Sequence, residues 1–518
     1  MTAKAGAPSA CTITWDAIEW SKALAHVRQL QMRIAKAFQQ GKHGKAKALQ
    51  WILTHSFYAK LISVKRVTRN HGARTTGIDK VLWKTPSQKM QAALTLKRRG
   101  YQTQPLKRIY IPKKQKGKLR PLSIPCMVCR AQQALYLLSL EPIAELNADK
   151  NAYGFRPLRS TADAIAQCFI ALAPGRSAQY ILEGDIKACF DSISSQWLIN
   201  NTPMDKVMLR KWLAAGYIDK GRLYHTYDGT PQGGIISPTL LTITLSGLEQ
   251  VVKAASKPGD KVNICIYTDD FIITGATQDV LEHKVKSAVE AFLNERGLSL
   301  SQEKTKIVHI KEGFDFLGMN IRKYKGKLLI KPAKSSVKRF LANVRETIKL
   351  NATVKTEELI RQLNPKIRGW SNYYRHVVAK DTFCYVDANI FRAIWRWATR
   401  RHPNKSTRWI KDKYFRRYKS KNWQFFAKVK DKQNYVTFLD LMEASKTPIR
   451  RHVKVRSEAT PFNAAYHDYF NQRILKRLRD KNSQAELDWW LCWWNLLSST
   501  QMKEKRKDRV VKSGLIKA

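Results

Sequence analysis

The strongest constraint on the fold is the stretch Tyr267-Thr268-Asp269-Asp270, which lies between two runs of β-forming residues. Residues 262–266 alternate in polarity before it, and residues 271–275 are mostly apolar after it. This pattern predicts a hairpin with two aspartates at its tip. Taken alone, the stretch is more typical of a surface turn that merely uses aspartate.

A second predicted strand, residues 180–186, carries Asp185 at its end and leads into Lys187-Ala188-Cys189-Phe190-Asp191. Adjacent like charges are costly unless a cation lies between them. Asp185 and the hairpin pair together therefore predict an oxygen-rich site for two Mg²⁺ ions. Such a site suits in-line phosphoryl displacement, because one ion activates the attacking hydroxyl and both stabilise the developing charge.

The charge balance indicates a polyanionic partner. The 518 residues carry a net charge of +54, and nucleic acid accounts for such an excess better than a solvated surface does. Residues 331–518 are the most basic part, with 44 Lys and Arg against 16 Asp and Glu, and they hold nine of the fifteen Trp. Aromatic rings among basic residues suit base stacking as well as core packing.

The eight Cys are scattered, and only Cys126 and Cys129 form a close pair, so no zinc site is expected. They indicate reduced thiols of an intracellular protein. No apolar run approaches the length of a membrane span, and residues 1–14 lack the apolar core of a signal peptide.

Elsewhere the periodicity predicts helices over residues 15–69, 127–146, 163–172, 238–254 and 278–296, with helices on both sides of the glycine-containing segment 224–238. Residues 70–79 are expected to form a loop. Residues 107–125 predict two strands joined by a basic turn, which could hold a triphosphate with Arg120 as a bidentate clamp. An exposed charged hairpin is the preferred interpretation of that segment alone. From about residue 331 the pattern is helical and basic.

Taken together, eight blocks resemble the group II intron-encoded proteins, which are reverse transcriptases and maturases. The blocks are IPKKQKGKLRPLSIP, YGFRPLRS, DIKACFD, TPQGGIISP, YTDDF, LSLSQEKTKI, GFDFLG and RGWSNYYR. The resemblance implies an α+β right-hand polymerase, with fingers and a palm built on antiparallel sheet, followed by an α-helical thumb or maturase domain. The implied division is an N-terminal helical extension (1–85), fingers and palm (86–330), thumb (331–450) and a basic C-terminal segment that could bind DNA (451–518).

The resemblance also implies roles for individual residues. Asp185, Ile186, Asp269 and Asp270 match the metal site, and Lys304 matches a proton donor to the pyrophosphate leaving group. Phe190 matches the residue that blocks a ribose 2′-hydroxyl, Lys118 and Arg120 match residues near the incoming triphosphate, and Gln232 matches one beside nucleotide and template. Phosphate and base contacts with intron RNA are expected in the thumb, at Arg368, Trp370, Arg375, Arg400 and Arg401. At least half of the aromatic rings beside those arginines are expected to be buried.

The implied function is RNA-directed DNA synthesis, combined with binding and splicing of a group II intron and with its mobility by target-primed reverse transcription. The implied partners are intron RNA, a DNA target and primer, and deoxynucleotides; a homodimer stays open. The implied setting is the bacterial cytoplasm or nucleoid, or else a plastid or mitochondrion. A splicing maturase with little polymerase activity is the alternative function, and a reverse transcriptase recruited to repair or defence is another.

Two departures from the family pattern stand out. The family usually has Ala before the paired aspartates, where this chain has Thr268, a larger residue expected to alter speed or fidelity. Many relatives end in a zinc-dependent HNH endonuclease, but beyond residue 450 only Cys492, His452 and His467 could bind zinc, so no DNA-cutting domain is expected. Residues 483–499, with four Trp, are expected to form an amphipathic helix packed on the thumb or on a partner.

Overall fold

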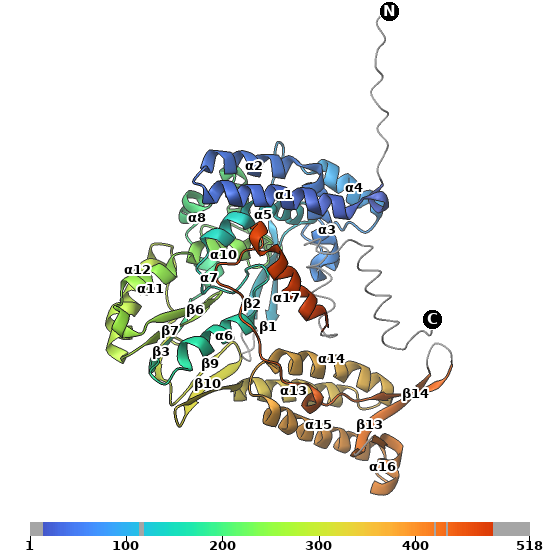
Figure 1. The fold of residues 1–518 in the computed structure, drawn as a ribbon. Helices are drawn as coiled ribbons and strands as arrows, with labels where there is room; N and C mark the ends of the chain where they lie inside the picture. Colours follow the sequence, from blue (N-terminus) through green and yellow to red (C-terminus); the bar gives the residue numbers. More distant parts are fainter. Residues whose placement is uncertain (1–13, 113–118, 419–420, 431–433, 480–518) are drawn as a thin grey trace, which may run out of the picture.

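The computed structural model describes residues 14–112, 119–418, 421–430 and 434–479. Lys118 and the Trp-rich segment 483–499 therefore lie outside the described residues. Figure 1 shows a helical N-terminal part, a central part built on sheet, and a group of long helices, α13 to α15, at the far end. Within the described residues no helix is long and apolar enough to cross a membrane.

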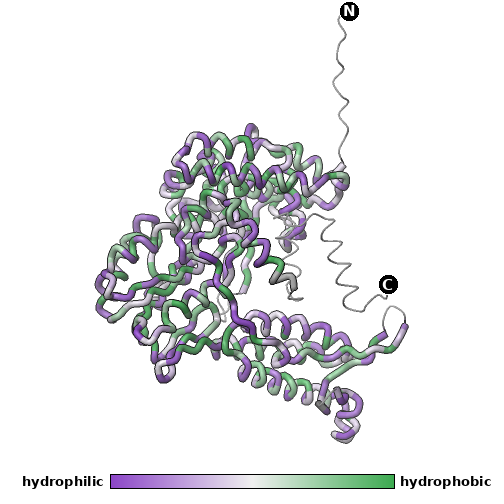
Figure 2. The backbone as a smooth tube through the Cα atoms, viewed as in Figure 1, coloured by the Kyte–Doolittle hydropathy of each residue, from purple (hydrophilic) through white to green (hydrophobic). Residues whose placement is uncertain are grey.

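The N-terminal part is helical, as the periodicity predicted. Leu30 and Ile34 of α1 and Leu53 of α2 are buried. Most basic residues of these helices lie outward, whereas Arg28 is half-buried. Figure 2 shows this alternation of apolar and polar residues along the chain. These helices pack on α5, which is buried along most of its length. The elements are η1 (Trp15–Ala17), α1 (Trp20–Gln39), α2 (His43–His55), α3 (Phe57–Arg69), η2 (His71–Arg74), α4 (Pro86–Thr95) and α5 (Met127–Asn147).

The first sheet has the strand order β2-β1-β4-β5, and the predicted basic hairpin forms its first two strands. The sequence analysis was wrong in placing a helix directly before residue 224. Lys220 and Gly221 have positive φ angles of 48° and 83° and turn the chain into a hairpin instead. The strands are β1 (Leu106–Pro112), β2 (Leu119–Ile124), β4 (Tyr217–Asp219) and β5 (Arg222–Tyr224), and α8 (Ser195–Asn201) and α9 (Lys206–Leu213) precede the second pair.

The palm sheet has the order β6-β7-β3-β8 and is antiparallel throughout. The single helix predicted over 238–254 is two helices, because Gly247, with a φ of 96°, breaks it. Helix α12 continues from a π-helical segment, Val280–Val285. The elements are α6 (Thr161–Leu172), β3 (Tyr180–Asp185), α7 (Cys189–Ser192), α10 (Ser237–Leu245), α11 (Leu248–Ala254), η3 (Pro258–Asp260), β6 (Asn263–Tyr267), β7 (Asp270–Gly275), α12 (Lys286–Asn294) and β8 (Lys306–His309).

A three-stranded sheet of order β11-β10-β9 connects the palm to the basic helical part. The sequence predicted helices beyond residue 331 but not the second sheet there, β12-β13-β14, which packs on α14 through Phe425 and Ala427 in a shared core. The elements are β9 (Phe314–Phe316), β10 (Met319–Tyr324), β11 (Lys327–Pro332), α13 (Lys334–Leu350), α14 (Thr356–Tyr374), α15 (Lys380–Arg401), α16 (Thr407–Tyr414), β12 (Phe415–Tyr418), β13 (Lys421–Lys430) and β14 (Val436–Asp440).

After β14 the chain runs back from the thumb to the palm and the N-terminal helices (Figure 1). We call residues 447–479 the return segment. Pro461 and Phe462 lie against Leu24, Val27 and Ile62 of α1 and α3. The sequence had treated everything beyond residue 450 as one basic C-terminal segment, whereas residues 451–479 are packed into the body of the molecule. The last short elements are η5 (Ala444–Lys446), η6 (Ala464–Tyr466) and α17 (His467–Arg479).

Candidate active site

Strand pairing brings the three aspartates together. Asp185, at the end of β3, lies directly opposite Asp270, the first residue of β7, in the antiparallel register. Asp269 occupies the hairpin tip, and its carbonyl accepts the N–H of Ile186 at 3.1 Å. The hairpin predicted from alternation thus places Asp185, Ile186, Asp269 and Asp270 at one end of the palm sheet, where Ile186 can contribute only its backbone.

The carboxyl groups at this end of the sheet repel one another. Burial raises the pKa of Asp270 well above its usual range, and the charges of Asp269 and Asp185 and a hydrogen bond with Asp185 raise it further. Lys304 acts against this shift, but it does not cancel it. The cluster therefore holds more negative charge than its own surroundings neutralise.

Lys304 provides the positive charge nearest to this cluster. Its Nζ atom lies 2.7 Å and 2.8 Å from the two carboxylate oxygens of Asp185. Burial by itself lowers the pKa of Lys304, but the hydrogen bond and charge of Asp185 and the charges of Asp270 and Asp269 raise it above its ordinary value. The ammonium group is therefore protonated at neutral pH and is available as a proton donor.

The donor set fits a hard divalent cation. Across the residues that the structure describes, no three His, Cys, Asp or Glu side chains lie close enough to hold a metal ion as they stand. The three aspartates nevertheless offer only oxygen donors, and the ammonium of Lys304 lies where a positive charge is needed. Oxygen ligands of this kind are those that Mg²⁺ prefers.

The segments expected to face the nucleotide converge next to the aspartates. The Phe190 carbonyl accepts the N–H of Thr230 at 2.6 Å, and Gln232 donates from its side chain to Asp191 at 2.9 Å. Gly229 permits this close approach, because a Cβ atom there would lie 2.6 Å from the Asp191 carbonyl oxygen and because its φ is +87°.

The same segment is tied to β2, since Ser123 donates its N–H to the Gln232 carbonyl at 2.7 Å. Arg120 lies on β2, exposed, in register with Ile111. The Phe190 ring is half-buried and meets the ring of Phe155 edge-on at 6.1 Å. Phe190, Gln232 and the strand that carries Arg120 thus belong to one connected region, as expected.

The thumb residues expected to contact RNA have different surroundings. Arg368 and Arg400 are exposed. Arg401 instead donates to the backbone carbonyls of Ala352, Thr353 and Val354 between α13 and α14, at 3.2, 3.4 and 2.6 Å. This geometry gives Arg401 a role in holding the thumb together.

Trp370 and Arg375 are also integrated into the thumb. The ring of Trp370 stacks on Phe340 at 4.6 Å and packs near Phe383. Arg375 is half-buried, and burial lowers its pKa. Of the rings at Trp370, Tyr373, Tyr374, Trp395 and Trp397, only Tyr374 and Trp397 are fully buried, fewer than the expected half.

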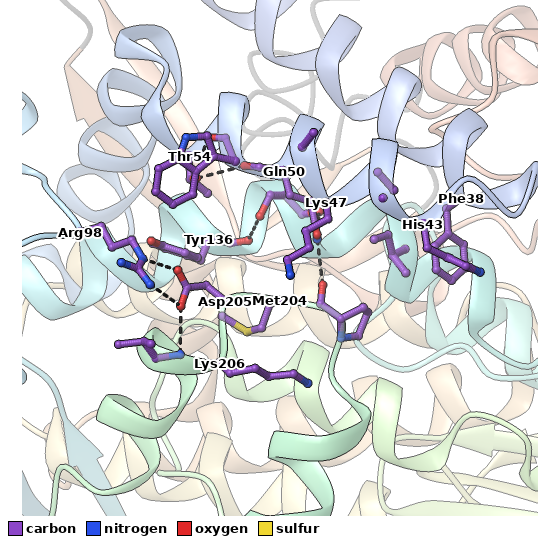
Figure 3. Close-up of a pocket in the computed structure, with 18 residues that line it drawn as sticks. Phe38, His43, Lys47, Gln50, Thr54, Arg98, Tyr136, Met204, Asp205 and Lys206 are labelled. Atoms are coloured by element: carbon purple, nitrogen blue, oxygen red, sulfur yellow. Dashed lines mark hydrogen bonds and ion pairs between the residues drawn. The ribbon is translucent and has the colours of Figure 1, made fainter.

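A cavity of about 810 Å³ lies far from these residues in the fold, between α2, α5 and the start of α9 (Figure 3). Several of its polar side chains bind one another or nearby carbonyls. Arg98 pairs with Asp205, and Gln50 donates to the carbonyls of Ser139 and Pro203 at 3.1 and 2.9 Å. None of the predicted site residues lines this cavity, so its size does not make it a candidate active site.

The hydrogen bonds that Thr268 and Asp163 make in the palm were not predicted from the sequence. The hydroxyl of Thr268 donates to the carboxylate of Asp269 at 2.7 Å. Asp163 of α6 is fully buried and binds the return segment, with His452 Nε2 at 2.7 Å and the N–H of Val455 at 2.8 Å. Thr268 was noticed as a departure from the family pattern, but no local signal links Asp163 to a residue 289 positions away.

Comparison with known proteins agrees with this arrangement. Three family models match in series: the N-terminal domain of reverse transcriptase over residues 15–96, reverse transcriptase (RNA-dependent DNA polymerase) over residues 111–321, and the group II intron maturase-specific domain over residues 337–415.

Among curated proteins, the chain is 31% identical to Protein YkfC of Escherichia coli over 50% of this chain and 79% of that protein. It is 28% identical to the group II intron-encoded protein LtrA of Lactococcus lactis over 60% of this chain and 68% of that protein. Among solved structures, a telomerase from Candida albicans has 13% identity and a TM-score of 0.35, over 60% of this chain and 64% of that one.

Proposed function

The chain belongs to the reverse transcriptases encoded by group II introns, and we propose that Asp185, Asp269 and Asp270 form its catalytic centre. It is an RNA-directed DNA polymerase that also acts in the splicing and mobility of an intron. The observation that carries the assignment of the centre is the register that sets Asp185 opposite Asp270 beside the Asp269 tip. No other group of carboxylates in the described residues lies at the end of a sheet next to Phe190 and Gln232.

In the proposed reaction the 3′-hydroxyl oxygen of a primer attacks the α-phosphorus of a deoxynucleotide. A new P–O bond forms as the hydroxyl loses its proton to water, and the bond between the α-phosphorus and the oxygen of the β-phosphate breaks to release pyrophosphate. Two Mg²⁺ ions held by the three aspartates would activate that hydroxyl and neutralise charge on the phosphates. Asp185 cannot serve Lys304 and a metal ion with the same oxygens, so Lys304 turns towards the leaving group and supplies its proton.

The remaining residues select and hold the nucleotide. Arg120 projects from an exposed strand position and can grip the triphosphate with its planar guanidinium group. The Phe190 ring packs against Phe155, and in this proposal it excludes a ribose 2′-hydroxyl and so favours deoxynucleotides. Gln232, fixed by Asp191 and Ser123, contacts the nucleotide or the template.

We further propose that exposed arginines of the thumb, Arg368 and Arg400, contact intron RNA, and that a DNA target supplies the primer. The excess of positive charge beyond residue 331 supports contact with phosphates. The six cysteines in the described parts of the chain are free thiols, five of them buried, which supports a reducing, intracellular setting.

Primer extension on an RNA template with Mg²⁺ tests the catalytic centre. Asp269→Ala should abolish extension, because a carboxylate of the metal site is removed. The same variant should still bind and help to splice intron RNA, since folding the RNA needs surface contacts rather than the palm carboxylates. Full extension by Asp269→Ala would refute the assignment, and loss of splicing with intact RNA binding would show that the two activities share the centre. Sequencing the RNA that co-purifies with the protein would identify the intron.

A further inference from the structure

Thr268 has a backbone conformation that β-branched residues avoid. It lies at the hairpin tip with a φ of +60°, in the left-handed region. Because Cβ branching crowds the backbone there, such a residue costs free energy that a glycine or asparagine would largely avoid. Its presence next to two metal-binding aspartates requires an explanation from its side chain.

The side-chain hydroxyl of Thr268 is bound to one specific carboxylate. Its Oγ1 atom donates to Oδ1 of Asp269 at 2.7 Å. A hydrogen bond to an ionised acceptor is stronger and more directional than one between neutral groups. The bond therefore restricts the rotation of the Asp269 carboxylate at the tip of a half-buried turn.

The methyl group of Thr268 lies against Gly154. A Cβ atom at position 154 would come within 2.5 Å of both Thr268 Cγ2 and Thr268 N, so only glycine fits there. The segment that carries Gly154 is itself fixed to β6, because Tyr153 donates to the Ile266 carbonyl and Ile266 donates to the Asn151 carbonyl, both at 2.9 Å. With its methyl group held in this contact, the side chain has little freedom to turn its hydroxyl away from Asp269.

We propose that Thr268 is a positioning residue, whose hydroxyl holds the Asp269 carboxylate ready to bind a divalent cation. The proposal rests on the catalytic role of Asp269 proposed above. Groups that hydrogen-bond a metal-binding carboxylate fix its orientation, and their loss commonly costs about 10–100-fold in metal affinity or activity. The strained turn persists because the hydroxyl and the methyl group act together.

Three substitutions separate the hydroxyl from the methyl group. Thr268→Ser keeps the hydroxyl and removes the methyl group, Thr268→Val keeps the shape and removes the hydroxyl, and Thr268→Ala removes both. Binding of Mn²⁺ to the protein without nucleic acid, measured by electron paramagnetic resonance, reports the metal site directly. Primer extension over a range of Mg²⁺ concentrations, with kcat and KM for the deoxynucleotide measured separately, reports its use.

The expected order is set by the hydroxyl. Thr268→Val should weaken Mn²⁺ binding about tenfold and raise the Mg²⁺ concentration needed for half-maximal kcat by a similar factor. The KM for the nucleotide should change much less. Ser should stay within about twofold of the natural protein, and Ala should resemble Val. Thr274→Val is the matched control, because Thr274 of β7 donates its hydroxyl to the Lys261 carbonyl at 3.0 Å, at the other end of the same strand.

Two results would overturn the proposal. If Val behaves as the natural protein and Ser is impaired, the methyl contact with Gly154 is what matters. If all three Thr268 variants bind Mn²⁺ as tightly as the natural protein, the hydroxyl does not position Asp269. Should the natural protein itself fail to extend a primer, the proposed function fails, whereas the order of Mn²⁺ affinities still tests the role of Thr268.

Discussion

Asp163 and Asp270 lie in the same palm, on α6 and β7, and their carboxyl groups have opposite surroundings. Burial raises the pKa of Asp270, and the neighbouring Asp269 and Asp185 raise it further. Burial alone would raise the pKa of Asp163 too, but the hydrogen bond and charge of His452 and further bonds from Ser160 and Val455 bring it down to about 2.

The partners of Asp163 come from across the molecule. His452, Val455 and Arg473 all belong to the return segment, and the Arg473 guanidinium lies 3.4 Å from the Asp163 carboxylate. Nearby, the buried Arg159 donates to the Ala459 carbonyl at 3.1 Å and to Glu145 at 2.6 Å. These contacts give Asp163 and Arg159 partners of opposite charge and fasten the return segment to the palm.

The difference between the two sites separates stability from function. A buried carboxylate with complete partners stabilises the folded chain. The palm aspartates instead keep their mutual repulsion, which is unfavourable for the protein alone and is relieved by bound cations. The unneutralised charge around Asp270 therefore supports the proposed catalytic role of the palm aspartates, whereas Asp163 has the surroundings of a structural carboxylate.

The largest effect should come from removing a carboxylate at the repulsive site. Asp270→Asn should lower the rate of primer extension by about a thousandfold or more, because several kcal/mol of transition-state stabilisation are lost. Its thermal unfolding should be unchanged or slightly delayed, since the repulsion with Asp185 and Asp269 is relieved. Extension assays and melting curves of the same preparation check both halves. If the Asp270→Asn protein melted at a lower temperature, the Asp270 carboxylate would stabilise the fold as that of Asp163 does.

At Asp163, whose carboxylate has hydrogen-bond partners, we expect a loss of stability without a loss of activity. Asp163→Asn should lower the free energy of unfolding by roughly 3 kcal/mol at pH 7, because a buried carboxylate is lost from a hydrogen-bonded cluster. Asp163 has a depressed pKa, so its stabilisation is present above about pH 4 and is lost as the pH falls towards 2. Urea unfolding at several pH values measures this, with the exposed Asp412→Asn as control. Extension per folded molecule should be retained.

A histidine near the return segment should make the fold sensitive to milder acid. Burial lowers the pKa of His376 to about 4, helped by the charges of His452 and Arg375, and its Nε2 atom is buried without a hydrogen-bond partner. The unfolded chain takes up this proton near the ordinary pKa of 6.5, so stability should fall from pH 6.5 to pH 4, by at most about 3 kcal/mol.

His376→Phe should flatten the stability profile between pH 6.5 and pH 4, a window above that of Asp163. Unfolding free energies at pH 7, 5.5 and 4.5 check this. A slope that survives the substitution would assign the titration to another group.

The smallest effect is expected at two adjacent arginines, which differ in whether the guanidinium group has partners within the protein. Arg400 is exposed, whereas Arg401 is bound to three carbonyls. Arg400→Ala should weaken intron RNA binding and reduce the slope of log affinity against log salt by roughly one, since one phosphate contact is lost. Arg401→Ala should leave the slope unchanged and lower thumb stability by about 1–2 kcal/mol. RNA affinity measured over a salt series with both variants checks this. A slope reduced by Arg401→Ala and not by Arg400→Ala would contradict these two roles.

The hairpin that carries the proposed catalytic pair could be predicted because its determinants are local. Alternation over residues 262–275 defines the two strands and their turn, and the strand that ends at Asp185 is equally plain. Within the hairpin, the short turn fixes the register of the two strands that it joins. Family resemblance added the roles of Phe190, Gln232 and Lys304, all of which lie in or beside this region.

The sequence by itself thus determined the palm hairpin, the helical and basic character of the thumb, and the identity of the three aspartates. Only the tertiary structure decided that Asp163 fastens the return segment, that Arg401 faces inward, and that Thr268 donates to Asp269 while its methyl group lies against Gly154. The reason is physical: periodicity records which face of an element is buried, whereas hydrogen-bond partners such as Asp163 and His452, 289 residues apart, depend on how whole elements pack. The hydroxyl of Thr268 is one residue from its acceptor, yet it points there because Gly154, from a distant segment, holds its methyl group.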